Sequence, residues 1–144
     1  MNKYPTNFKE AIVSAVPNCT TMVLTMMTFN LYIYDALTLS AFLHAFPLIW
    51  ITAFCLDFFI VGPAVLRFVA RYNIMKYMPF IRVGLMAGIL TFLAPLIETG
   101  VIIPGAVYLM AVVRNYIAAL CFQVFIALPF GLYVLRRWRM MVAK

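Results

Sequence analysis

Four long apolar runs limit what this chain can fold into more than any other feature. They cover about residues 11–32, 40–70, 80–97 and 105–136. Each is long enough to cross a hydrocarbon core of about 30 Å, because an α-helix rises about 1.5 Å per residue. Charged residues make up only 10% of the 144 residues, whereas a soluble domain carries roughly a quarter. The sequence therefore predicts an all-α integral membrane protein, with four transmembrane helices in a single membrane domain over residues 1–144.

The second and fourth runs contain two related stretches. Cys55–Pro63 reads CLDFFIVGP and Cys121–Pro129 reads CFQVFIALP, with a constant offset of 66 positions. The first stretch has an aspartate where the second has a glutamine. We interpret the chain as two tandem two-helix repeats, about residues 8–72 and about residues 79–139.

Basic residues collect at alternate ends of the expected helices. The amino terminus, the connector between the second and third helices and the carboxyl tail hold ten of the eleven Lys and Arg residues. The other two exits contain Asp35 and Glu98. Because cytoplasmic loops carry the excess of Lys and Arg, both termini and the middle connector are predicted to be cytoplasmic. The two repeats would then be parallel.

The same basic clusters predict the partners of the chain. They flank apolar helices, where Lys and Arg bind anionic lipid at the cytoplasmic surface. We therefore expect the lipid bilayer as the main partner and no nucleic acid, although the net charge is +7. The clustered residues are Arg67, Arg71, Lys76, Arg82, Arg136, Arg137, Arg139 and Lys144.

Asp57 is the outstanding candidate for a functional side chain. It falls near the middle of the second apolar run, where a charged Asp costs about 2.5–3.5 kcal/mol on insertion scales. Such a group must be protonated or paired, and must face the protein interior. One interpretation is a proton- or cation-coupling carboxylate, and the other is a buried hydrogen bond that fixes helix register.

The first apolar run has a polar face that can supply partners for Asp57. Ser14, Asn18, Thr21, Thr25 and Thr28 follow steps of three and four, which put them on one side of a helix. Thr21 and Thr25 are expected at the depth of Asp57 and could donate to it. Gln123 occupies the repeat-related position and could also donate. The possible polar or coupling site is therefore Asp57, Gln123, Thr21, Thr25 and Asn18.

Three further residues define a possible polar site on the outer side, namely His44, Arg114 and Glu98. Arg114 is expected to extend to the outer interface. Gly84 and Gly88, four residues apart, form a helix-packing motif that allows close approach of a second helix. That helix could belong to the same chain or to another subunit.

Enzyme chemistry has no support in the sequence. No paired carboxylates, Ser/His/Asp set or glycine-rich phosphate loop is present. The single His and the three separated cysteines predict no metal site and no disulfide framework. We expect no catalytic residues and no cofactor.

Short motifs resemble a family of small bacterial inner-membrane proteins with tandem two-helix units, the domain of unknown function DUF2798. In the second unit they are residues 88–91, residues 98–100, and Phe125–Pro129 with the trailing Arg136 and Arg137. The first unit matches less closely, through Thr25 and residues 60–71. The resemblance implies a multi-pass protein of the bacterial inner (plasma) membrane and supplies no activity.

The layout is also similar to that of compact proton-coupled biocide exporters, which are built from paired two-helix units. Those proteins carry an acidic residue in the first helix, where this chain has the Ser/Asn/Thr face. Two functions therefore stay open. One is an accessory or assembly component that associates through its helices, as a homo-oligomer or with a membrane partner protein. The alternative is a small proton- or cation-coupled transporter or channel that uses Asp57.

Overall fold

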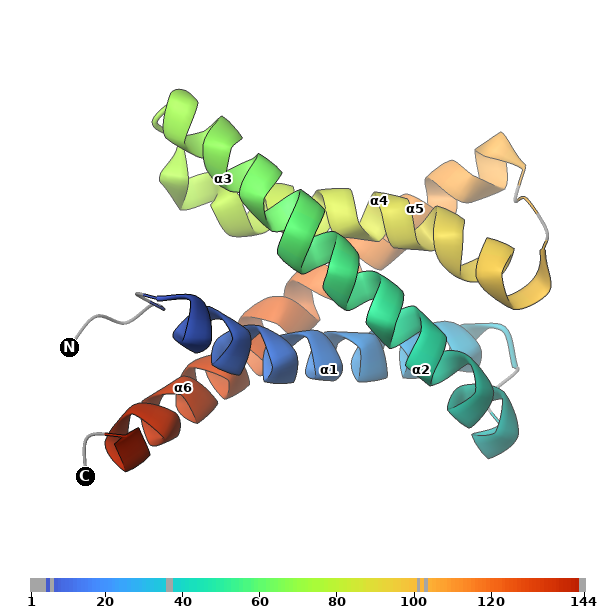
Figure 1. Cartoon of the computed structure of the whole chain (residues 1–144). Helices are drawn as coiled ribbons and strands as arrows, with labels where there is room; N and C mark the ends of the chain where they lie inside the picture. The colour runs from blue at the N-terminus through green and yellow to red at the C-terminus, as the bar shows by residue number, and fades with distance from the viewer. Residues whose placement is uncertain (1–4, 6, 36–37, 101, 103, 143–144) are drawn as a thin grey trace.

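The chain is all-helical in a computed structural model (Figure 1). The structure describes residues 5, 7–35, 38–100, 102 and 104–142, and for residues 75, 98 and 99 it describes the backbone alone. The helices, in chain order, are α1 (Phe8–Ile33), α2 (Leu39–Cys55), α3 (Gly62–Arg71), α4 (Met78–Thr99), α5 (Gly105–Phe122) and α6 (Leu128–Val142). Two π-helical segments, η1 (Leu56–Val61) and η3 (Gln123–Ala127), and the 3₁₀ turn η2 (Met75–Tyr77) lie between them.

The π-helical segments join α2 to α3 and α5 to α6, so each pair forms one continuous long helix. Among the described residues, four helices are long and apolar enough to cross a membrane, namely Phe8–Ile33, Leu39–Arg71, Met78–Ile97 and Gly105–Val142. This confirms the predicted all-helical chain with four helices of membrane-spanning length. The last helix continues six residues beyond its expected end at residue 136, because the basic segment at its end keeps helical geometry.

Local signals mark most of the helix ends. Asn7 and Thr38 cap α1 and α2, since their side chains accept the backbone N–H groups of Glu10 and Ala41 at 2.9 and 3.2 Å. Both residue types are favoured N-caps because they satisfy a free N–H of the first turn. Gly100 ends α4 with φ of 68°, a left-handed conformation that glycine adopts without the steric cost of a Cβ.

Each long helix changes its packing partner along its length. In the first hairpin, α2 packs mainly on α1 and also contacts α4, whereas η1 and α3 pack on α4. In the other hairpin, α5 packs mainly on α4 and also contacts α1, whereas η3 and α6 pack on α1. Figure 1 shows the start of α1, the end of α6 and the α3–α4 junction at one end of the molecule. The π-helical segments therefore lie where a long helix leaves its own hairpin and joins the other.

The buried faces of the two long helices follow a step of four residues. Such a step turns by about 40° around an α-helix with 3.6 residues per turn. The extra residue of a π turn rotates the buried face back by about 100° around the helix axis. The buried face therefore stays directed at the neighbouring helices. The buried residues are Ile49, Ala53, Val61, Val65 and Val69 in one helix, and Ala111, Asn115, Ala119, Ala127, Gly131 and Leu135 in the other.

Glycines allow two close helix contacts. A Cβ on Gly131 of α6 would lie 3.2 Å from the backbone oxygen of Ser14 in α1, so only glycine fits this approach without a shift. Gly84 and Gly88 of α4 face Tyr116 and Tyr108 of α5, and the Tyr108 hydroxyl donates to the Gly88 carbonyl at 2.9 Å. The predicted glycine motif thus accommodates a neighbour within the chain.

Candidate functional site

A large crevice occupies the centre of the molecule between the two hairpins. Its volume is about 1360 Å³, above the usual range of about 300–1,000 Å³ for small-molecule pockets. Residues of all six α-helices line it. The lining runs from Pro5 and Phe8, at the end where the chain begins, to Tyr34 and Arg114 near the other end. We call this space the central crevice.

An ion pair forms one wall of the central crevice. Asp57 of η1 accepts two hydrogen bonds from Arg82 of α4, from Nε to Oδ1 and from Nη2 to Oδ2, both at 2.6 Å. This two-point geometry is the strongest that a guanidinium and a carboxylate make. The side chain of Asp57 is 15% exposed and that of Arg82 is 32% exposed. The pair is therefore sheltered but borders the open volume, and both residues line it.

Arg82 was missed as a site residue in the sequence, where it counted as one of the basic residues that flank the membrane. It stands four residues after the start of α4, and its side chain is long enough to reach a carboxylate on a crossing helix. The signal that could have found it is an Arg inside one apolar run and a carboxylate near the middle of another. The pairing itself depends on how α4 and the Asp57 helix cross.

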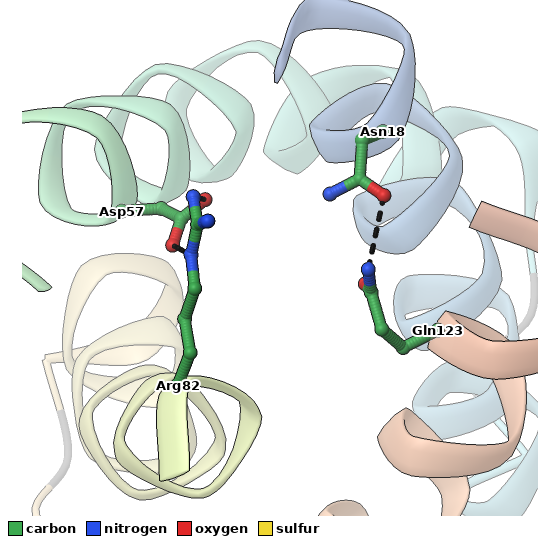
Figure 2. A network of polar contacts seen from close by, with 4 residues as sticks. All are labelled: Asn18, Asp57, Arg82 and Gln123. Carbon is green, nitrogen blue, oxygen red and sulfur yellow. Dashed lines mark hydrogen bonds and ion pairs between the residues drawn. The ribbon is translucent and has the colours of Figure 1, made fainter. Parts of the chain in front are cut away.

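A neutral amide pair lies beside the ion pair. Gln123 of η3 donates from Nε2 to the Oδ1 oxygen of Asn18 in α1 at 3.1 Å. Figure 2 shows the two pairs next to each other, with Asp57 and Arg82 from one set of helices and Asn18 and Gln123 from the other. All four residues line the central crevice. The structure therefore brings Asn18, Gln123 and Asp57 to one cavity, but Gln123 donates to Asn18 and not to Asp57.

The two predicted threonine donors bond within their own helix. The Thr21 hydroxyl donates to the Pro17 carbonyl at 2.8 Å, and the Thr25 hydroxyl donates to the Thr21 carbonyl at 2.8 Å. Neither residue lines the central crevice. The expectation that these hydroxyls would serve Asp57 is therefore wrong, because the carbonyl one turn back is closer and is always available to a helical Thr.

A second polar cluster closes the far end of the crevice around Arg114 of α5. The Nη2 group of Arg114 donates to Oδ1 of Asn30 at 3.1 Å and to the Tyr34 hydroxyl at 3.3 Å, and its Nε donates to Oδ1 of Asn115 at 3.4 Å. The guanidinium also lies over the Tyr34 ring, 5.3 Å from its centre. Asn115 is buried and donates to the Thr91 hydroxyl at 3.0 Å. The cluster joins α1, α4 and α5.

The other two members of the predicted outer-side site are not brought into this cluster. His44 is exposed on α2. The side chain of Glu98 lies outside the described residues. Only Arg114 of that group is therefore placed in a defined polar environment.

A second ion pair ties the two ends of the chain together. Arg139 of α6 donates to Glu10 of α1 from Nε to Oε1 at 2.8 Å and from Nη2 to Oε2 at 2.6 Å. Glu10 is only 7% exposed. No sequence signal predicts this contact, since both residues resemble ordinary charges at helix ends.

Charge is sparse in the central crevice, and its walls are mostly apolar. Its charged lining residues are Asp57, Lys76, Arg82 and Arg114, so cations outnumber the carboxylate. Among the described residues, no group of three His, Cys, Asp or Glu side chains could hold a metal ion. The arrangement suits the binding of an apolar or amphipathic molecule, with the Asp57 carboxylate on the wall.

Comparison with known proteins gives one family. No curated protein and no solved structure matches the chain, so the layout shared with biocide exporters gains no support. The family match covers the first hairpin, where the sequence resemblance was the weaker of the two. Residues 7–73 match the model of the family described as a domain of unknown function (DUF2798), which confirms for this part of the chain the family that the sequence predicted.

Proposed function

We propose that the chain is a small multi-pass transport protein of the bacterial inner membrane, a transporter or channel in which Asp57 couples transport to protons or cations. One observation carries the proposal: Asp57 lies on the wall of a crevice of about 1360 Å³ instead of inside a sealed helix contact. A carboxylate that served only to fix helix register would need no such space. No enzymatic activity is part of the proposal.

The ion pair supplies a mechanism for coupling. An Arg remains charged at all physiological pH values, whereas a carboxylate can take up a proton. Protonation of Asp57 would remove the charge that holds Arg82 and would weaken the link between the Asp57 helix and α4. Because η1 is a π-helical segment at the point where the long helix changes its partner, a change there alters the packing of α3 on α4. Segments of this kind are frequent at functional sites.

We propose further that the two hairpins are parallel repeats with both termini in the cytoplasm. Three observations support this. The two π-helical segments end 66 positions apart, at Val61 and Ala127. Five buried residues of each long helix recur with the same offset, from Ile49 and Asn115 to Val69 and Leu135. The start of α1, the end of α6 and the α3–α4 junction share one end of the molecule (Figure 1), and the basic residues cluster there.

Anionic lipid is the proposed partner of that end. Lys76, Arg71, Arg136 and Arg137 are exposed, and each such cation near an anionic surface contributes about 1 kcal/mol. Exposed apolar residues such as Phe59 and Phe125, which are 64% and 78% exposed, suit contact with acyl chains. The lipid bilayer is therefore the environment that both kinds of surface fit.

An accessory or assembly role is the second candidate. It would use the large exposed apolar faces to bind a further copy or a membrane partner protein. The glycine motif that would favour close contact between subunits is already partly occupied by Tyr108 and Tyr116 of the same chain, although both glycines still line a surface groove. We therefore favour transport.

Proton flux into vesicles tests the proposed function. The full chain is reconstituted with trapped pyranine, a pH gradient is imposed, and the membrane potential is clamped with K⁺ and valinomycin. We expect acidification faster than in empty vesicles and loss of this flux in Asp57→Asn. The control is Gln123→Leu, which removes the repeat-related amide and should retain the flux. Flux in Asp57→Asn equal to wild type, or no flux above empty vesicles, would overturn the proposal.

A further inference from the structure

The guanidinium of Arg114 is held at the far end of the central crevice by neutral groups. Its described acceptors are the amide oxygens of Asn30 and Asn115 and the hydroxyl of Tyr34. The residue is partly buried and lines the crevice. These oxygens orient the cation and satisfy several of its N–H groups, but they leave its charge without a carboxylate among the described side chains. A cation held in this way favours an anion from outside the chain.

The charge of the whole crevice has the same sign. Its charged lining residues are three cations, Lys76, Arg82 and Arg114, and one carboxylate, Asp57. The carboxylate is already paired with Arg82. A cleft with apolar walls and an excess of one charge focuses its field and concentrates ions of the opposite sign. Such a field would favour an organic anion over an organic cation as the ligand.

Between the Arg114 cluster and the level of Asp57 and Gln123, the crevice wall is apolar and flexible. Arg114 and Gln123 are nine residues apart on one continuous helix, which corresponds to about 14 Å. Met22, Met26, Met27 and Met86 line the crevice. Methionine adapts to apolar groups of different shape because its side chain is unbranched and polarisable.

We propose that the central crevice binds an amphipathic organic anion, with the acidic group at Arg114 and the apolar body along the methionine wall. The inference rests on the proposed function and deepens it, because it gives the class of substrate for the same crevice. The acid group can be a carboxylate, sulfonate or phosphate. Its source is a free organic anion or the headgroup of an anionic lipid, and the binding chemistry is shared.

Equilibrium binding to the full chain in lipid nanodiscs tests the inference. The probe is 1-anilinonaphthalene-8-sulfonate, a permanent anion, and its neutral counterpart is N-phenyl-1-naphthylamine, which has the same rings without the sulfonate. Empty nanodiscs of phosphatidylcholine supply the background for both. Unlabelled octanesulfonate and octanol serve as the charged and neutral competitors on the wild-type chain, so the first comparison needs no substitution.

Arg114→Gln, Arg114→Lys and the exposed Arg136→Gln complete the set. We expect the sulfonate probe to bind about tenfold more weakly to Arg114→Gln, a loss typical of one charged contact. Arg114→Lys is expected to retain most of the affinity, Arg136→Gln to match wild type, and the neutral probe to bind wild type and Arg114→Gln equally. Nanodiscs containing phosphatidylglycerol separate the sources: displacement of the probe there supports the site and identifies anionic lipid as an occupant.

Two results would overturn the inference. One is displacement of the sulfonate probe by octanol as well as by octanesulfonate. The other is unchanged affinity of Arg114→Gln for the sulfonate probe. Binding requires no ion gradient, so Arg114-dependent binding without proton flux would leave this inference intact and overturn the proposed function. Proton flux that depends on Asp57, without binding that depends on Arg114, would leave the proposed function intact and overturn this inference.

Discussion

The ion pair and the amide pair occupy corresponding places but differ in chemistry. Asp57 and Gln123 are 66 positions apart, and each lies at the start of a π-helical segment. Each bonds to the first helix of the other hairpin, to Arg82 of α4 and to Asn18 of α1. One contact carries two full charges and the other carries none. The crevice therefore has a charged two-point contact on one side and a single neutral hydrogen bond on the other.

The packing beside the two pairs differs as well. Gly131 brings α6 close to the backbone of α1, and the Glu10–Arg139 ion pair holds the ends of these helices together. At the corresponding place on the other side stands Val65, which packs α3 on α4 through its side chain together with Val61 and Val69. We infer that the α1–α6 contact is the fixed side of the crevice. The α3–α4 contact is the side that protonation of Asp57 can alter.

The largest expected effect is the loss of Arg82. Arg82→Gln leaves the Asp57 carboxylate sheltered without a cation, which we expect to lower the free energy of unfolding by about 2–3 kcal/mol, somewhat below the cost in a fully buried pair. Denaturation with sodium dodecyl sulfate in mixed micelles measures the change. The double variant Asp57→Asn with Arg82→Gln is the control and should recover at least half of the loss. A loss no larger than that of Gln123→Leu would contradict the distinction between the two pairs.

The second largest loss of stability is expected at the α1–α6 contact. Gly131→Val installs the residue found at the corresponding position 65, and its Cβ would lie 3.2 Å from the Ser14 backbone oxygen. Overpacking of this kind costs about 1–3 kcal/mol, and we expect about 2 in the same denaturation assay. Gly105→Ala is the matched control, since no atom lies within 4 Å of a Cβ there. Equal stability of the two variants would show that α1 and α6 do not need their close contact.

The amide pair should contribute less. Gln123→Leu removes one neutral hydrogen bond to Asn18, which typically contributes about 1 kcal/mol. We expect a decrease of this size in the free energy of unfolding and no change in proton flux. A loss of flux equal to that in Asp57→Asn would mean that both pairs take part in coupling.

The smallest effect is expected on the polar face of α1. Thr21→Ala and Thr25→Ala remove hydroxyls that bond to their own helix, so each should change the free energy of unfolding by less than about 0.5 kcal/mol. Flux should equal that of wild type in both variants. A clear loss of flux in either one would assign these threonines to the site, against their observed bonding.

The sequence was sufficient for the coarse fold, because apolar runs of membrane-spanning length are a local signal that the four long helices of the described residues confirm. The isolated carboxylate of Asp57 is also a local signal, and its functional role stays a prediction. The partner of Asp57 was not a local signal. Arg82 follows the charge pattern of a cytoplasmic flank, and only the crossing of α4 with the Asp57 helix brings the two side chains together.

The π-helical segments were also missed, although the sequence contains a trace of them. Pro63 and Pro129 recur inside long apolar helices, each just after a π-helical segment. Proline lacks the N–H that would continue the α-helical ladder, so a local change in helix geometry could have been expected there. The polar face of α1, in contrast, was a clear sequence signal that predicted the wrong contacts. Its regular spacing indicated a shared surface, but a threonine in a helix can satisfy its hydroxyl on the preceding turn.

Transport that uses Asp57 requires the central crevice, where lining cations outnumber the carboxylate, to be open to water. Cysteine accessibility tests it most directly, in a chain whose Cys19, Cys55 and Cys121 are replaced by Ser. Met22→Cys lies on the crevice wall, and Leu24→Cys lies on the same helix outside the lining. Methanethiosulfonate reagents bearing a sulfonate or a trimethylammonium group are applied from each side of the membrane in turn, with rates normalised to a free thiol.

We predict that Met22→Cys is modified and Leu24→Cys is not. The anionic reagent should react with Met22→Cys at least about threefold faster than the cationic one, because the field of the crevice concentrates anions. Failure of both reagents to modify Met22→Cys, from either side of the membrane, would contradict the account.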